Sequence, residues 1–329
     1  MPSMLALGRV WQIIKEVDLE AIRRQAEAPV RVAVVAETPA VADDLAVLLA
    51  SGDPKASEWL TAMDAGLASR VVGAAPTDPV VDGPDVIVLV TTADHPAPAM
   101  NAVRQAWLDR RTPLLEVVLG GREVTVDRQD AQRARVALDV LGPERVAALA
   151  DGLFAVVAPD RRLALARQFP ALRACAFSTL IDETSKANAG YAFSTGIAEI
   201  IPVLGIPMTI GDMVVLTKNQ LLMGYRIALA AGRSGQPREL IAEILGVLGG
   251  GLLFRQLARQ LIGLVPVIGI VPKVAVAYGG TWAIGRAVTL WATGAGRVTG
   301  ERLRQLSREG LRRGETVARD MREAGGGGR

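Results

Sequence analysis

Short apolar runs alternate with amphipathic stretches between residues 30 and 168. The apolar runs are rich in β-branched residues and predict four buried strands, at Val30–Ala36, Val86–Thr91, Pro113–Leu119 and Phe154–Ala158. The stretches between them predict helices at Val41–Ala50, Ala97–Leu108, Arg128–Leu141 and Asp160–Gln168. Strands that alternate with helices indicate a parallel sheet with helices on both faces, which binds its ligands at the carboxyl ends of the strands.

The segments on either side of this α/β pattern are predicted to be helical. Residues 4–27 place apolar side chains at helical spacing, which predicts an amphipathic helix that packs on the following domain. Residues 188–297 are helical in character, with many glycine and proline breaks. Within them, Ile201–Ile206 recurs as Val265–Ile270, and Ala231–Arg233 recurs as Ala295–Arg297, both at an offset of 64 residues. This recurrence indicates two copies of one helical unit.

Charge divides the 329-residue chain, whose formal net charge is +3. Residues 188–297 carry only 9 basic and 4 acidic side chains, which places a domain border near residue 180. The predicted fold class is α/β plus all-α. We expect an N-terminal amphipathic helix (1–28), a GTPase-like α/β domain (29–170), a helical domain (171–300) and a basic helical tail (301–329) with a disordered Gly325–Gly328 end.

Composition removes several classes of function. The content of 50% hydrophobic residues excludes wholesale disorder. A single cysteine, Cys175, and a single histidine, His95, exclude an internal disulfide framework and a two-histidine metal motif, so no metal is expected. His95 beside Asp94 could serve as a general base, but a lone histidine in a polar loop is more often solvated. No secretory signal opens the chain, so we expect its start to stay in the cytoplasm.

The segment after the first strand occupies the position of a phosphate-binding loop. Alignment with G-x-x-x-x-G-K-S/T places Ala42 at the second glycine, Asp43 at the lysine and Asp44 at the Ser/Thr. Like charges about 4 Å apart repel by about 4 kcal/mol at an effective dielectric near 20, so these carboxylates disfavour phosphate. The alternative role of Asp43 and Asp44 is to complement the positive end of the following helix.

The guanine-recognition motif of GTPases is also absent from its expected position. A GTPase strand ends in N-K-x-D, whereas the third predicted strand is followed by Gly120, Gly121, Arg122 and Glu123, where only the acid survives. A second match, Thr217–Gln220, lacks the final aspartate and lies in the helical block. An atypical nucleotide hydrolase would instead use Glu37, Thr38 and Glu123, near the strand ends.

The helical block leaves two options for membrane contact. A membrane-spanning helix needs about 20 mostly apolar residues, and the charge-free runs of this block are shorter. Two segments reach that length only if they include one charged residue, at Ala187–Gly211 with Glu199 and at Gln260–Gly285 with Lys273. A charge at the centre of a span costs about 2.5–3.5 kcal/mol of insertion free energy, and each Leu, Ile, Val or Phe contributes only about 0.3–0.6 kcal/mol in favour. The net free energy of inserting each span is therefore close to zero. Membrane association and a soluble bundle both remain open. The basic tail has no aromatic residues between its arginines, so nucleic acid is not an expected partner.

Three strings in the helical block, Asn188–Phe193, Ile201–Gly205 and Thr217–Arg226, resemble the bacterial domain-of-unknown-function family 697. The resemblance continues through the second repeat to about Arg297. The N-terminal half looks like a diverged Era-like GTPase domain in its order of strands and helices. The resemblance implies a GTPase-like domain joined to a helical domain on the cytoplasmic side of the inner membrane, since some members are described as inner-membrane proteins. It does not carry GTP hydrolysis over, because the motif positions are altered.

These observations predict a non-catalytic, GTPase-like protein with a membrane-associated helical domain, which acts as a scaffold or interaction module. No cofactor is expected, and GTP is the one candidate. Membrane lipid is the expected partner, and a homo-oligomer is a further option. The polar candidates in the helical domain are Asn188, Glu199, Asp212, Lys218 and Asn219. Two alternatives stay open: a soluble helical-bundle interaction protein, and a GTP-binding or GTP-hydrolysing protein with an atypical site.

Overall fold

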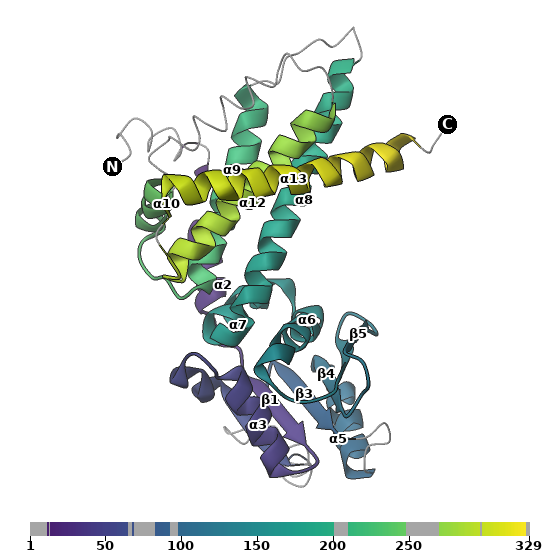
Figure 1. Cartoon of the computed structure of the whole chain (residues 1–329). Coiled ribbons are helices and arrows are strands. Elements are labelled where there is room, and N and C mark those ends of the chain that lie inside the picture. The colour runs from purple at the N-terminus through teal and green to yellow at the C-terminus, as the bar shows by residue number, and fades with distance from the viewer. Residues whose placement is uncertain are drawn as a thin grey trace. The chain divides into compact units, whose positions relative to one another are not determined.

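The structure is a computed structural model of the chain. It describes residues 12, 14–64, 68, 83–92, 98–200, 210–247, 270–296 and 298–326, without the side chains at 196–200, 210–213, 270 and 325–326. The chain divides into two compact units. The α/β unit is Arg24–Ala176, and the helical unit combines Met1–Arg23 with Phe177–Arg329. Figure 1 labels the elements of both units.

The α/β unit contains a six-stranded, mostly parallel sheet. Its strands are β1 Val32–Ala36, β2 Leu60–Asp64, β3 Val86–Thr91, β4 Leu114–Leu119, β5 Thr125–Arg128 and β6 Arg133–Leu138. Their order is β2-β1-β3-β4-β6-β5, and every neighbouring pair is parallel except β5–β6. The predicted strands that became β1, β3 and β4 are confirmed, and so is the mixed α/β class. Every residue of β1 and β3 is buried, which explains their unbroken apolar character.

Helices cover both faces of the sheet. They are α3 Pro39–Leu49, α5 Pro98–Asp109 and α6 Val146–Val156. The unit also contains α7 Arg162–Gln168 and 3-10 turns at Pro54–Trp59, Pro143–Arg145, Pro159–Arg161 and Pro170–Leu172. Met100, Val103 and Trp107 of α5 pack against alternate residues of β1, β3 and β4. The chain moves in opposite directions across the sheet from β1 to β2 and from β3 to β4. Right-handed crossovers therefore place α3 and α5 on opposite faces (Figure 1).

The predicted strand at Phe154–Ala158 is wrong, because most of this run belongs to α6. A short apolar run has the same appearance in a buried strand and on a buried helix. Leu149, Leu153 and Val156 are buried at helical spacing. A Cβ atom on Gly152 would lie 2.6 Å from Val136 Cγ2 of β6, so the glycine lets this helix approach the sheet closely.

The predicted helix at Arg128–Leu141 is also wrong, since this segment ends β5 and forms β6. Alternate residues of β6 are buried, which is the period of a strand that is fully covered on only one face. The turn depends on Asp130, whose carboxylate accepts hydrogen bonds from the Gln132 amide (2.8 Å) and from Arg133 Nε (2.6 Å). Strand β2, which has no counterpart among the predicted strands, extends the sheet beside β1.

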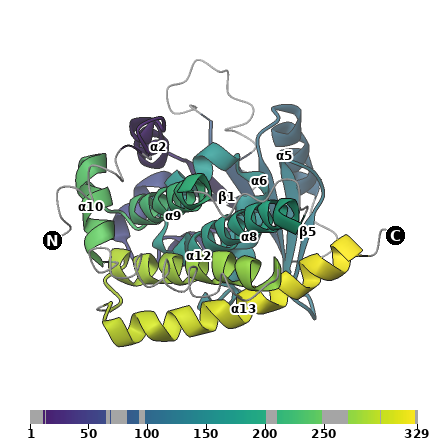
Figure 2. The ribbon, with the colours of Figure 1, turned by 90° about the horizontal axis from the view of Figure 1, so that it is seen from above.

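The helical unit is built from α8 Arg173–Ile200, α9 Ile210–Ala230, α10 Pro237–Val247, α12 Ile270–Ala292 and α13 Gly300–Gly326 (Figure 2). The start of α8 belongs to the α/β unit. Shifted by 64 residues, α9 falls on residues 274–294, which overlap α12 and agree with the predicted repeat. The two Pro-Val-x-Gly copies lie outside the described residues. Within the described part of the chain, no helix is both long and apolar enough to cross a membrane.

Helices α12 and α13 approach each other through small residues. A Cβ atom on Gly279 would lie 2.6 Å from the carbonyl oxygen of Gly310, and a Cβ atom on Gly314 would collide with the carbonyl oxygen of Ala275. The spacing of four residues on both helices is the small-xxx-small pattern that lets two helix backbones come together. Beside this contact, the Arg313 guanidinium lies 4.8 Å from the centre of the Trp282 ring.

The two ends of the chain differ from expectation. Helix α2, Leu19–Glu27, begins in the helical unit, where Tyr225 Oη donates a hydrogen bond of 3.3 Å to the Leu19 carbonyl. The residues of α2 up to Arg23 therefore belong to the helical unit, whereas the sequence predicted packing on the domain that follows; only the end of the helix, from Arg24, belongs to the α/β unit. Helix α13 continues through Gly326, so the first two glycines of the predicted disordered end are helical. Residues 327–329 lie outside the described residues.

Candidate functional site

The strand order of the α/β unit creates one topological switch point. From β1 the chain crosses to β2 on one side, and from β3 it crosses to β4 on the other. Open sheets of this kind bind ligands in the crevice outside the carboxyl ends of the two strands where the order reverses. The residues that follow β1 and β3 therefore form the candidate site of this unit.

A side-chain hydrogen bond joins the two strands at the switch point. Thr92 Oγ1, directly after β3, donates a hydrogen bond of 2.6 Å to Oε2 of Glu37, directly after β1. Glu37 is half-buried, and Thr92 is exposed. A carboxylate therefore occupies the place where an incoming phosphate would need hydrogen-bond donors. His95 and Asp94 lie outside the described residues.

The connection from β1 to α3 is only two residues long, Glu37 and Thr38. The aligned phosphate-loop motif begins at Glu37, and its last six positions, Pro39–Asp44, all lie within α3. Proline has no backbone N–H, so the first residue of α3 offers no donor to an anion. A loop that wraps a phosphate with converging N–H groups is absent from this described segment.

The three aligned phosphate-loop residues occupy different environments on α3. Ala42 is fully buried, so its methyl group packs in the core. Asp43 and Asp44 are exposed. Because α3 begins at Pro39 and not at Val41, both aspartates lie beyond the first turn. The helix field falls off within that turn, so the prediction that these carboxylates complement it is wrong.

The aligned guanine-loop residues lie in the connection from β4 to β5. Gly120 has a φ of +89°, a left-handed conformation that favours glycine. The Gly121 amide donates a hydrogen bond of 3.1 Å to the Leu138 carbonyl of β6. Glu123 is exposed in the same turn. These residues therefore lead the chain into an edge hairpin.

The helical unit holds a second cluster of polar side chains, which joins α8, α9 and α12. Asn188 Nδ2 donates a hydrogen bond of 2.9 Å to Thr281 Oγ1, and Asn219 Nδ2 donates one of 2.8 Å to Asn188 Oδ1. Gln220 Nε2 donates to the same threonine oxygen at 3.1 Å. Thr281 donates its own proton to the Ala277 carbonyl at 2.7 Å, so the bonding capacity of its hydroxyl is used in full. We call Asn188, Asn219, Gln220 and Thr281 the core polar cluster.

Two members of the core polar cluster, Asn188 and Asn219, were predicted from the sequence as polar candidates. The other two, Gln220 and Thr281, were not predicted, and both are buried. Their only sequence signal is a polar residue within an apolar helical stretch. Asn219 and Gln220 belong to the string that resembled a guanine-reading motif, and the structure places this string inside α9. Beside Asn188 on α8, the buried Ser185 hydroxyl has no hydrogen-bond partner among the described residues.

The remaining polar candidates do not join this cluster. Lys218 lies 3.9 Å from a carboxylate oxygen of Glu16, and the glutamate side chain is largely exposed. A pair of this kind contributes little to stability. Glu199 and Asp212 belong to α8 and α9, but their side chains lie outside the described residues.

No group of three or more metal-ligating side chains gathers in the part of the chain that the structure describes. Comparison of the chain with protein-family models, with curated proteins and with solved structures finds no match.

Proposed function

We propose that the chain is a non-catalytic, GTPase-like protein whose helical unit associates with a membrane and which acts as a scaffold or interaction module. One observation carries the non-catalytic part. Helix α3 begins two residues after β1, so the segment that would wrap a phosphate is already helical. The strand order supports the GTPase-like part, because it places the residues after β1 at a switch point.

The electrostatics of the switch point also disfavour a nucleotide. Glu37 places a carboxylate at the end of β1, and Asp43 adds an exposed carboxylate where a phosphate loop carries its lysine. Pro39 removes one of the free N–H groups that make the start of a helix attractive to anions. All three features act against phosphate, so binding of another protein is the better use of this surface.

Titration of the full chain with a fluorescent GTP analogue tests the non-catalytic part. We expect no saturable binding at micromolar concentrations, and none for the double variant Asp43→Lys/Asp44→Ser, because the short connection remains. Saturable micromolar binding by the unaltered chain that Asp43→Lys does not improve would refute this part. Phosphate release that Glu37→Ala abolishes would instead favour an atypical hydrolase, and Glu58→Ala, in the turn before β2, is the matched control.

Fractionation of bacterial cells that express the full chain tests the membrane part. We expect the protein in the membrane pellet after lysis without detergent. Alkaline carbonate then separates the two modes, since it strips peripheral proteins and leaves embedded ones. Recovery in the supernatant before carbonate treatment would contradict the proposal and favour a helical bundle that binds only proteins.

A further inference from the structure

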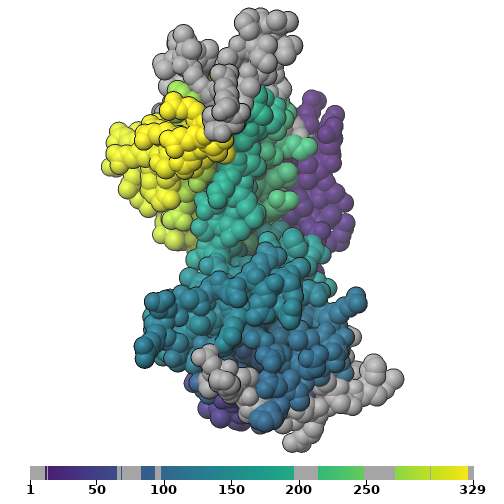
Figure 3. Space-filling model, turned by 90° about the vertical axis from the view of Figure 1, so that its right-hand side faces the viewer, coloured from purple at the N-terminus to yellow at the C-terminus, as the bar shows by residue number. Residues whose placement is uncertain are grey.

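Three arginines form a row on the solvent-facing side of α13. Arg304, Arg308 and Arg312 are spaced by four residues and are all exposed. At 100° per residue they cover about 80° of the helix circumference and about 12 Å of its length. The buried residues Leu306, Gly310 and Gly314 lie on the other side of the helix. We call Arg304, Arg308 and Arg312 the arginine row, and Figure 3 shows α13 in yellow at the surface of the helical unit.

Other arginines of α13 have partners that use their charge or their donors. Arg302 donates a hydrogen bond of 2.6 Å to Gln305, Arg313 donates one of 3.2 Å to Glu309, and Arg319 lies 3.9 Å from a carboxylate oxygen of Glu315. Within the described ranges, no hydrogen bond or ion pair joins the arginine row to another side chain. The row therefore presents three guanidinium groups whose donors remain available to a partner.

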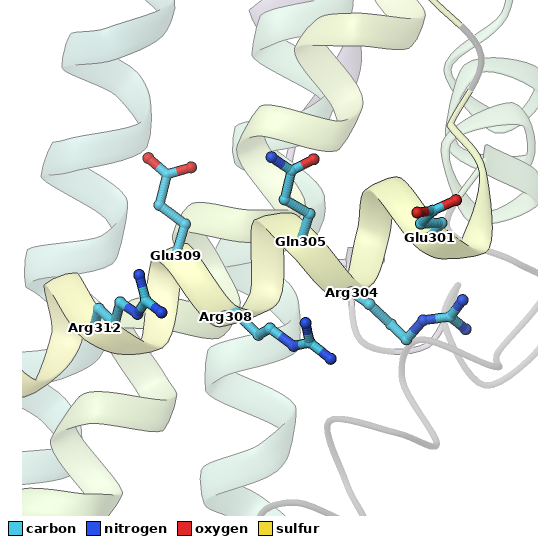
Figure 4. Close-up of a pocket in the computed structure, with 6 residues that line it drawn as sticks. All are labelled: Glu301, Arg304, Gln305, Arg308, Glu309 and Arg312. Carbon is cyan, nitrogen blue, oxygen red and sulfur yellow. The ribbon is translucent and has the colours of Figure 1, made fainter.

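The arginine row borders an open hollow at the surface of α13, together with Glu301, Gln305 and Glu309. In Figure 4, Arg304 and Arg308 extend to the same side of α13, and Gln305 and Glu309 extend to another side. Because Glu309 already pairs with Arg313, its charge does not offset the row. The side of α13 that carries Arg304 and Arg308 is therefore positively charged.

We propose that the arginine row is the surface by which the helical unit binds the anionic headgroups of a lipid bilayer. This inference rests on the membrane association proposed above and assigns it to one side of one helix. The planar guanidinium group binds phosphate oxygens through two parallel hydrogen bonds, and its charge is attracted to an anionic leaflet. Leu311, 37% exposed and three residues after Arg308, adds an apolar side chain that can enter the headgroup boundary.

The composition of α13 favours lipid over nucleic acid. The helix contains no aromatic residue, so it lacks the stacking platform of single-strand binders. A helix that lies in the groove of a duplex has phosphates along both of its sides, so the five acidic residues of α13 would repel them, whereas a flat bilayer contacts only one side. A planar anionic surface therefore complements the row better than a groove.

Sedimentation of the full chain with lipid vesicles tests the proposal. The vesicles are phosphatidylcholine alone, or phosphatidylcholine with about a third of phosphatidylglycerol. The test variants are Arg308→Gln and Arg304→Gln/Arg308→Gln. The matched control for Arg308→Gln is Arg302→Gln, which removes one charge from another side of the same helix. Circular dichroism verifies that all three variants fold. We expect binding to the anionic vesicles only, weakened about fivefold by Arg308→Gln and about 25-fold by the double variant, and little changed by Arg302→Gln.

The other outcomes separate the two proposals. Equal weakening of vesicle binding by Arg308→Gln and Arg302→Gln, or by neither, would overturn the assignment to the arginine row while leaving membrane association in place. Failure to bind either vesicle would contradict both proposals. Binding to duplex DNA or to polyglutamate that depends on Arg304 and Arg308, without vesicle binding, would overturn the lipid proposal and identify another anionic partner.

Discussion

Thr92 donates a hydrogen bond of 2.6 Å to the Glu37 carboxylate, and this bond connects the carboxyl ends of β3 and β1. The two residues are 55 positions apart in the chain, and they meet because β1 and β3 are adjacent in the sheet. The bond joins the two strand ends at the switch point through side chains of the protein itself.

The Glu37–Thr92 bond should contribute to stability and not to nucleotide binding. Thr92→Val keeps the side-chain shape and removes the donor, so we expect the free energy of unfolding to fall by about 0.5–1.5 kcal/mol. Urea denaturation measures this change. Thr125→Val, at an exposed position of β5, is the control and should stay within about 0.5 kcal/mol. Equal changes in the two variants would show that the bond has no energetic role.

The core polar cluster should be energetically coupled. Asn188→Leu leaves Asn219 without its acceptor and removes one donor to Thr281, so we expect a loss of about 1–3 kcal/mol. A double-mutant cycle with Thr281→Val should give a coupling energy of at least about 0.5 kcal/mol by urea unfolding. Thr289→Val, whose hydroxyl donates only to the Gly285 carbonyl, should show no coupling to Asn188. Additive effects in the Thr281 cycle would contradict the cluster.

The contact between α12 and α13 should reverse the usual effect of a glycine-to-alanine change. Gly310→Ala adds a methyl group that meets the Gly279 backbone, and overpacking of this kind costs about 1–3 kcal/mol. Gly190→Ala on α8 adds a methyl group with no described atom within 4 Å, so it should stabilise its helix by up to about 1 kcal/mol. Thermal unfolding compares the two variants. A melting temperature that rises in both would mean that α12 and α13 are not in close contact.

The hydrogen bond between Asp139, which follows β6, and Arg145 can be tested by titration. A hydrogen bond from Arg145 holds the pKa of the Asp139 carboxyl below its usual 3.8. A lowered folded-state pKa stabilises the fold above pH 3.8, and this contribution disappears as the pH falls through the lowered value. Arg145→Gln should therefore raise the Asp139 pKa toward 3.8 in an NMR titration. Arg122→Gln, in the turn between β4 and β5, should leave it unchanged.

The sequence predicted the central strands because both of their faces are buried. Val86–Thr91 is apolar at every position except the last, so the strand could be predicted without knowing which of its faces points into the core. The segment Arg133–Leu138 was predicted wrongly because every residue in it except Val136 favours a helix. Its alternating burial arises only once it pairs with β4 and β5 in the sheet. The segment Phe154–Ala158 has the apolar pattern of a buried strand because its apolar residues are consecutive, although its first three residues end α6.

At the candidate sites, the sequence showed which residue types were present but did not predict which side chains contact one another. The altered phosphate-loop positions Ala42, Asp43 and Asp44 follow from residue identity alone. The start of α3 at Pro39, which makes the loop too short, depends on how the helix packs behind β1. Asn188 was visible as a polar residue in an apolar stretch, but its acceptor, Thr281, lies 93 residues away.

The sequence by itself determined the central strands, the loss of the glycine-lysine phosphate loop and the supply of arginines in α13, because each depends on residue type and local period. The tertiary structure decided that Glu37 meets Thr92, that Asn188 meets Thr281, and that Arg304 and Arg308 face outward while Gly310 faces α12. These contacts join distant segments or select one side of a helix. They form only when the sheet order and the helix packing bring buried surfaces together, and the burial of apolar side chains drives that step.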